Sequence, residues 1–385
     1  MIAIEQNDLR GRGPRPCMRA ADLAIFEEEG SWSGPLLRAV NYVADAVAAA
    51  FPKRPVRVST LAYVHTQDPP KHTLPRDNVV IRLVGYHCGW GVPLANGSSA
   101  GDLAFMSQLR NWSKIAPGKL WIWTWNTDFD AWVLPWPDYY STGPNTRLFR
   151  AYGVTGAFQE GQFMAYGGDM QEMKSWVGQK ILWDPSSDDK ALITQFLNGW
   201  YCGSSRLSCH AAVAVQRHID LYHTSFLSTA SSTVFLSKGE AYTKAKALYL
   251  TPSVVLTALA NLRAEQARLG RGGGSAGGGL LPPQTVRERL QRVELGSLFV
   301  LLLRWSEMRK WASQNSVKWP AEDTVDAAFG RFASWYKTFG LDRRIGYGSS
   351  AARGVDIDYG LSSQPQRSLQ WLNETIRKLN RSDEA

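Results

Sequence analysis

Residues 120–125, Leu-Trp-Ile-Trp-Thr-Trp, place a tryptophan at every second position, and the polar stretch Asn-Thr-Asp-Phe-Asp follows at residues 126–130. Alternation of this kind is typical of a β-strand, so Trp121, Trp123 and Trp125 are expected on one face of it. Flat indole rings can cover the face of a sugar, while amides and carboxylates bind its hydroxyl groups. The stretch therefore indicates either a sugar-binding cleft or a heavy aromatic core, with Trp121 nearer the core and Trp125 nearer the rim.

Further apolar runs, separated by helical patterns, predict that this strand belongs to a parallel sheet. The expected strands span residues 2–6, 56–64, 78–84, 120–125 and 154–158, and the expected helices span 35–51, 101–114, 144–152 and 169–183. Repeated βα units form either a doubly wound sheet or a barrel, and no Gly-x-Gly-x-x-Gly follows any strand to mark a nucleotide-binding fold. We therefore expect an α/β fold, a partial TIM-type (β/α) barrel of about five parallel strands whose first strands are missing, over residues 1–205.

The strand signal fades after the first half of the chain. Amphipathic patterns at residues 207–226, 240–269, 283–313 and 321–339 predict an α-helical domain over residues 206–340. The glycine-rich segment 270–279 lacks side chains that could pack, so we expect a disordered insertion there. Residues 341–385 are expected to form an irregular tail with a short helix at 366–379.

The composition limits the classes of function. The chain has 385 residues, 44% of them hydrophobic, and a formal net charge of +9, but its basic residues are scattered and form no stripe interleaved with aromatic residues. Nucleic acid is therefore not an expected partner. The four cysteines form no Cys-x-x-Cys pair and have no histidine at zinc-finger spacing, so neither a metal nor another cofactor is expected, and one disulfide is allowed without being required.

No apolar run reaches the length that a membrane span needs, so no membrane insertion is expected. The chain starts inside an apolar strand pattern, where a signal peptide or a loop would be usual. We therefore expect that an upstream part is missing, and the sequence leaves both the localisation and the oligomeric state open.

Parallel barrels carry functional groups at the C-terminal ends of their strands. A glycosidase needs two carboxyl groups across one bond, and we expect Asp8 as the general acid and Glu160 as the base or nucleophile. The structural alternative for each is a carboxylate that caps the next helix or turn. The expected substrate-binding residues are Asn7, Tyr63, His65, His87, Trp123, Trp125, Asn126, Asp128 and Trp136.

Several short segments of the sequence resemble those of one known family. EGSWSGPLLR at residues 29–38, PRDNVVIR at 75–82, LWIW at 120–123, GVTGAFQEG at 153–161 and LWDP at 182–185 are similar to the family catalogued as domain of unknown function 4838. The resemblance implies a glycoside-hydrolase-like (β/α) barrel related to α-glucuronidase-type proteins, and a carbohydrate partner. Where the family has Phe-Glu at the end of its last strand, this chain has Phe158, Gln159 and Glu160, so the carboxylate stands one position later.

Three hypotheses about function remain open at this point. The chain acts on glycans as a glycoside hydrolase, or it is a non-catalytic carbohydrate-binding relic of such an enzyme. The third hypothesis, a nucleic-acid binder driven by its positive charge, requires an affinity that falls steeply with added salt.

Overall fold

The computed structural model describes residues 1–6, 16–128, 131–162, 167–206, 208–229, 245, 247–271, 279–341 and 369–381. Contacts within the chain group it into two compact units. The first unit contains Met1–Trp125 and Pro144–Glu160, and the second contains Asn126–Gly143 and Gly161–Ala385. Each unit is therefore built from segments that are separate in the sequence.

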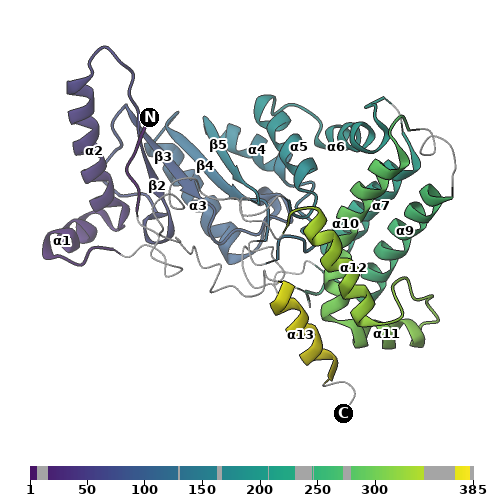
Figure 1. The fold of residues 1–385 in the computed structure, drawn as a ribbon. Helices are drawn as coiled ribbons and strands as arrows, with labels where there is room; N and C mark the ends of the chain where they lie inside the picture. The colour runs from purple at the N-terminus through teal and green to yellow at the C-terminus, as the bar shows by residue number, and fades with distance from the viewer. Residues whose placement is uncertain are drawn as a thin grey trace, which may run out of the picture. The chain divides into compact units, whose positions relative to one another are not determined.

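The first unit is centred on a parallel five-stranded sheet with the order β1-β2-β3-β4-β5 (Figure 1). Its strands are β1 (Ile2–Ala3), β2 (Val58–Ala62), β3 (Val79–Val84), β4 (Leu120–Trp125) and β5 (Gly156–Glu160). The prediction of five neighbouring parallel strands in a mixed α/β chain is confirmed. The fifth strand begins and ends two residues later than the pattern at 154–158 indicated, so Gln159 and Glu160 belong to the strand itself.

One face of the sheet is a closed apolar core. Ile81 and Leu83 of β3 and Leu120 and Ile122 of β4 alternate along their strands with the side chains of the other face, and all four are at most 1% exposed. Helix α2 (Ser33–Ala50) packs against β2 and β3. Its apolar side, which includes Leu37, Val40 and Ala44, is buried.

The other face of the sheet carries the tryptophans. In the parallel register Arg82 lies beside Trp121, Trp123 beside Phe158, and Trp125 beside Glu160. Trp121 and Trp123 are half-buried, Phe158 is 48% exposed and Trp125 is only 4% exposed. The depth of burial along β4 is therefore opposite to the expectation, because Trp125 is the most covered of its three tryptophans.

The remaining helices of the first unit follow the βα alternation. They are α1 (Ala20–Glu29), α3 (Ala100–Ile115) and α4 (Thr142–Ala151), the last of which starts in the second unit. Ser99 caps α3 by accepting a hydrogen bond from the Asp102 amide. The predicted helices at 35–51, 101–114 and 144–152 are confirmed, whereas α1 was not predicted.

The second unit consists mainly of helices. They are α5 (Gln171–Trp183), α6 (Asp189–Leu197), the π-helical turn η3 (Asn198–Cys202), α7 (His210–Thr229), α9 (Pro252–Gly270), α10 (Pro283–Leu303), α11 (Trp305–Gln314), α12 (Val325–Thr338) and α13 (Leu369–Arg381). Helices α7, α9, α10 and α12 pack on one another through fully buried side chains such as Val255, Leu259 and Leu298. None of the described helices is long and apolar enough to cross a membrane.

The pattern at residues 283–313 predicted one continuous helix, and the structure has two. The break is at Arg304, whose backbone leaves the helical region with φ −129° and ψ 34°. The Arg304 guanidinium donates hydrogen bonds to the carbonyls of Ala245 and Leu250. These contacts are distant in the sequence, so the helical periodicity could not reveal the break.

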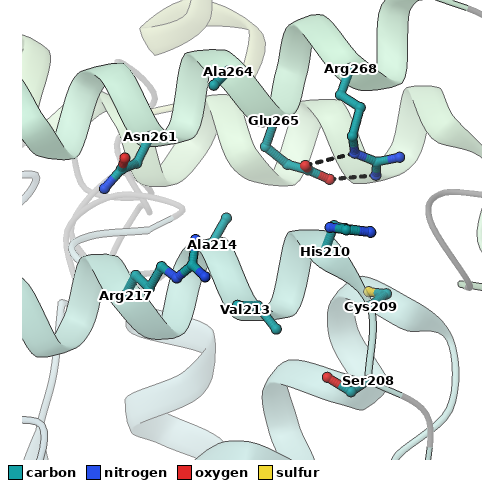
Figure 2. Close-up of a pocket in the computed structure, with 10 residues that line it drawn as sticks. All are labelled: Ser208, Cys209, His210, Val213, Ala214, Arg217, Asn261, Ala264, Glu265 and Arg268. Atoms are coloured by element: carbon teal, nitrogen blue, oxygen red, sulfur yellow. Dashed lines mark hydrogen bonds and ion pairs between the residues drawn. The ribbon is translucent and has the colours of Figure 1, made fainter.

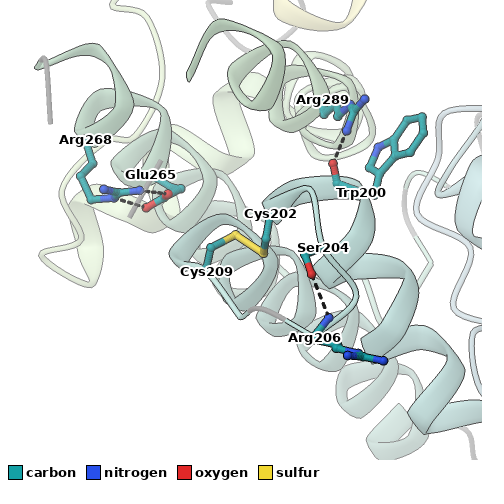
Figure 3. Close-up of a disulfide and its surroundings, with 8 residues drawn as sticks. All are labelled: Trp200, Cys202, Ser204, Arg206, Cys209, Glu265, Arg268 and Arg289. Atoms are coloured by element: carbon teal, nitrogen blue, oxygen red, sulfur yellow. Dashed lines mark hydrogen bonds and ion pairs between the residues drawn. A yellow bond between two sulfur atoms is a disulfide. The ribbon is translucent and has the colours of Figure 1, made fainter. Parts of the chain in front are cut away.

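A disulfide joins Cys202 at the end of η3 to Cys209, which precedes α7, with the two Cα atoms 5.6 Å apart (Figure 3). Cys88 is a buried free thiol and Cys17 an exposed one. The disulfide closes the short turn between η3 and α7.

A buried ionic cluster anchors the segment before α4 to α5. The Lys174 ammonium lies 2.9 Å from an Asp138 oxygen and 3.2 Å from an Asp169 oxygen, and the Tyr139 hydroxyl donates to the same Asp169 oxygen at 2.9 Å. Lys174 also donates to the Trp136 carbonyl at 2.9 Å. Burial raises the pKa of Asp138 to about 6 and raises that of Asp169, although Lys174 opposes both shifts.

Replacing Lys174 by Met should lower the free energy of unfolding by about 3–5 kcal/mol, because two buried carboxylates lose their cation. Urea unfolding at neutral pH measures the loss. Lys337→Met, at an exposed position of α12, is the matched control and should change the free energy by less than about 0.5 kcal/mol. Equal stability of the two variants would contradict an anchoring role for the cluster.

His218 of α7 is a second buried polar group. Its side chain is 1% exposed, packs against the Tyr222 ring at 4.9 Å, and has no hydrogen-bond partner on either nitrogen among the described residues. Burial lowers the pKa of His218 to about 3. The folded protein therefore holds a neutral imidazole where the unfolded chain takes up a proton.

The stability of the protein should depend on pH through His218. As pH falls from about 6.5 towards 3, the unfolded chain gains a proton that the fold excludes, and stability drops by about 1.4 kcal/mol per pH unit. In His218→Leu this pH-dependent loss of stability is absent. The free energy of unfolding of the variant should therefore fall less steeply than that of the wild type as the pH is lowered. His210→Leu, at the exposed start of α7, makes the same chemical change and is the matched control. Parallel slopes for His218→Leu and wild type would contradict the prediction.

Candidate functional site

The C-terminal edge of the sheet gathers aromatic and acidic side chains from neighbouring strands. Tyr63 follows β2, Tyr86 and His87 follow β3, Trp125 ends β4 and Glu160 ends β5. Parallel strands expose their C-terminal ends at one edge, where α/β proteins generally hold their ligands. These residues form a candidate site, which we call the sheet-edge site.

Glu160 is held by two tryptophans. The indole nitrogens of Trp123 and Trp125 both donate to the same Glu160 oxygen, Oε2, at 2.7 Å and 2.6 Å. The arrangement follows from the register, since Trp125 is the neighbour of Glu160 across the ladder and Trp123 precedes it by one strand period on the same face. Glu160, which stands one position later than the glutamate of the family's pattern, therefore lies on the same face of the sheet as Trp123 and Trp125.

Two N–H donors have a clear electrostatic effect on a carboxylate. Hydrogen bonds to the charged form stabilise it, and indole nitrogens can only donate. Glu160 is half-buried, so these bonds also fix the position of its side chain. An ionised, positioned carboxylate can act as a base, as a nucleophile or as an acceptor for hydroxyl groups.

Tyr86 connects the aromatic part of the sheet-edge site. Its ring meets the rings of Tyr63 at 5.3 Å, His87 at 4.4 Å and Trp125 at 5.9 Å, all in edge-to-face geometry. Edge-to-face contacts stabilise aromatic pairs and leave part of each ring uncovered. Tyr63 and Tyr86 are half-buried and His87 is exposed, so the cluster reaches the surface of the unit.

The loop that carries His87 is built by close packing. Asp102 of α3 accepts hydrogen bonds from the Gly89 amide at 2.8 Å and from the Ser99 hydroxyl at 2.7 Å. A Cβ atom at Gly101 would meet the His87 carbonyl oxygen at 1.9 Å, so only glycine allows this approach. The loop after β3 is therefore tied to the start of α3.

Arg82 and Glu5 form an ion pair on the tryptophan face that the sequence analysis missed. The Arg82 guanidinium lies 5.9 Å from the centre of the Trp123 ring, which places it at the outer limit of a cation–π contact. Burial lowers the pKa of Arg82. The feature of the sequence that could have indicated this ion pair is Arg82 itself, a single charged residue inside the apolar strand pattern at residues 78–84.

The other predicted site residues lie elsewhere. His65 is half-buried in the short helical turn η1 (Val64–Thr66) after β2. Asn126, Asp128 and Trp136 belong to the second unit, where the Asp128 carboxylate accepts from the Ala131 amide at 3.2 Å and Trp136 is 1% exposed. Asn7 and Asp8 lie outside the described residues. The structure thus brings together Tyr63, His87, Trp123, Trp125 and Glu160, and adds Tyr86 to them.

A separate hollow of about 570 Å³ lies between α7 and α9 of the second unit (Figure 2). Side chains from the two helices face one another across it, with Arg217 from α7 and Glu265 and Arg268 from α9. Arg268 and Glu265 satisfy each other through two hydrogen bonds of 2.8 Å and 2.6 Å. In the part of the chain that the structure describes, no group of three or more His, Cys, Asp or Glu side chains could hold a metal ion.

Comparison with known families gives one match. A family model described as a domain of unknown function (DUF4838) matches residues 1–220, which is more than half of the 385-residue chain. No curated protein matches the sequence.

A double-mutant cycle tests the contact between Trp125 and Glu160. Trp125→Phe and Glu160→Leu should be coupled by about 1.5–3 kcal/mol in the free energy of unfolding, because the contact is a hydrogen bond to a charged group. Trp121→Phe is the matched control, since Trp121 lies on the same face and its buried indole nitrogen has no hydrogen-bond partner among the described residues. Paired with Glu160→Leu, it should show a coupling below about 0.5 kcal/mol. Similar couplings for both pairs would contradict the arrangement.

Proposed function

For this chain, which belongs to the DUF4838 family, we propose a carbohydrate-active function of the glycoside-hydrolase type at the sheet-edge site. In this proposal the five parallel strands are part of a TIM-type (β/α) barrel, and the tryptophan face is directed towards its interior. The sugar binds at the C-terminal edge, against the half-buried Tyr63 and the exposed His87.

One observation carries the proposal: the Glu160 carboxylate, held at a strand end by two indole donors and bordered by an aromatic cluster. Here two indole nitrogens donate to the carboxylate, and the half-buried ring of Trp123 also offers apolar surface of the kind that a pyranose needs. The combination supports a sugar site more than a purely structural one.

The proposed role of Glu160 follows from its two indole donors. Glu160, stabilised as a carboxylate, is suited to be the base or nucleophile of glycoside hydrolysis, which requires an ionised carboxyl group. The matching general acid is assigned to Asp8 from the sequence, at a position outside the described residues. His87 and Tyr63 would bind hydroxyl groups of the sugar.

The second candidate function is carbohydrate binding without cleavage. It is favoured by the double use of Glu160 Oε2, because an oxygen that accepts two short N–H bonds has less capacity left to attack an anomeric carbon or a water proton. A binding protein would use the same carboxylate to accept bonds from sugar hydroxyls. The two candidates share a ligand and differ in product formation.

Glu160→Gln tests both candidates. For an enzyme, turnover of the responsive member of a glycan panel should fall at least about 100-fold while affinity changes by only a few-fold, because the charge is lost and the shape is kept. Glu27→Gln makes the same chemical change at an exposed position of α1 and should leave turnover and affinity unchanged.

Product analysis and titration calorimetry together separate the outcomes. Binding of a glycan by the wild type without product supports the binding function, and Glu160→Gln should then weaken the affinity. Turnover that survives Glu160→Gln would show that the catalytic role is wrong, and a panel that is neither bound nor cleaved would overturn the proposal as a whole.

A further inference from the structure

A cleft of about 300 Å³ opens in the helical unit among the start of α5, the end of α6 with η3, and the first half of α10. We call it the α6–α10 cleft. Its apolar lining comes from Phe196 and Trp200 on one side, Phe339 at the end of α12, and the thioethers of Met170 and Met173. Its lining residues all belong to the second unit, so it is distinct from the sheet-edge site.

Arg289 of α10 is the fixed cation of this cleft. Its guanidinium lies 3.9 Å from the centre of the Trp200 ring, and it donates a hydrogen bond to the Trp200 carbonyl (Figure 3). Stacking and this bond hold the planar group in one orientation, while a guanidinium carries five N–H donors in all. A fixed guanidinium with remaining donors is suited to bidentate binding of a carboxylate.

The acidic side chains near Arg289 have other partners. Among the described residues Glu172 pairs with Arg292 at 2.9 Å, and Glu288 is exposed and accepts a hydrogen bond from Gln284. No ion pair is formed by Arg289 itself within the same set of residues. Arg289 is half-buried, and burial lowers its pKa although Tyr201 and Glu172 oppose the shift. The four charged side chains of the lining, Glu172, Glu288, Arg289 and Arg292, sum to zero, and among them Arg289 has a guanidinium without an ion pair in the described residues, which suits a monoanion rather than a more highly charged ligand.

Backbone irregularities surround the same cleft. Trp200 lies in the π-helical turn η3, and Met170 adopts the left-handed region with φ 49°. Both conformations cost free energy, and both are found preferentially at functional sites. The disulfide at Cys202 fixes the far end of the π turn and so the position of Trp200 (Figure 3).

We propose that the α6–α10 cleft binds a small ligand with a carboxylate on a flat apolar ring. The carboxylate takes the free donors of Arg289, and the ring packs between the aromatic side chains and the methionine thioethers. A phosphate, with its higher charge, fits less well, because Glu172 and Glu288 also line the cleft. The proposal is independent of the carbohydrate function.

Titration calorimetry of the full chain with benzoate tests the ligand class. Benzoate should bind at least about tenfold more tightly than benzyl alcohol, which keeps the ring and lacks the charge, and than acetate, which keeps the charge and lacks the ring; tenfold corresponds to 1.4 kcal/mol. Phenyl phosphate should bind more weakly than benzoate. No benzoate binding, or equal binding of benzoate and benzyl alcohol, would overturn the proposal.

Variants locate the site. Arg289→Met should weaken benzoate binding at least about tenfold, and Arg289→Lys, which keeps the charge and loses the planar fork, should weaken it by an intermediate factor. Arg217→Met removes an exposed arginine of the α7–α9 hollow (Figure 2) and should leave the affinity unchanged. Circular dichroism checks the fold of each variant, and the Lys variant decides the matter if the Met variant unfolds. Full benzoate affinity in Arg289→Lys, or an equal loss in Arg217→Met, would show that the Arg289 fork is not the binding group.

Discussion

The parallel register between β4 and β5 is the constraint on which the sheet-edge site depends. It sets Trp125 beside Glu160 and Trp123 beside Phe158, so the two indole nitrogens reach one carboxylate oxygen. Side chains alternate along a strand, so a slip of one residue would send Glu160 to the helix-covered face, where a carboxylate would be buried among apolar side chains. The backbone hydrogen bonds between β4 and β5 thus determine which side chains donate to Glu160, and no loop residue is needed for this arrangement.

Local pattern was sufficient to predict the sheet and most of its helices. The alternation at residues 120–125 gave the correct strand, and Tyr63, His87 and Glu160 lie at the C-terminal ends of neighbouring strands, whereas Asn126 and Asp128 belong to the second unit. The alternation of residues along a strand determines on which face of the sheet a side chain lies, but it does not determine how deeply that side chain is buried. Trp125 is buried and contacts Tyr86 from the loop after β3 and Glu160 from β5, and both contacts are distant in the sequence. Arg82 paired with Glu5 escaped prediction for the same reason.

The helical part of the chain contains contacts that the local sequence pattern does not reveal. An amphipathic stripe predicted the helices, yet the Arg304 guanidinium, the Trp200 carbonyl and the Lys174 ammonium each bind a partner that is distant in the sequence. Each places a polar or charged group inside a mostly apolar interior. Such groups persist only where hydrogen bonds and opposite charges are assembled together, and one sequence does not show which distant residues will supply them.

The chain passes between its two compact units after Trp125, after Gly143 and again after Glu160. Neither unit is therefore a continuous stretch that could be excised, exchanged with another protein or duplicated as a module. An insertion or deletion in the short excursion of residues 126–143 would act on two structures at once, on the end of the tryptophan strand and on the Asp138 and Tyr139 side of the ionic cluster. The two compact units are therefore interleaved along the chain, and neither can be separated from the other by a single cut in the sequence.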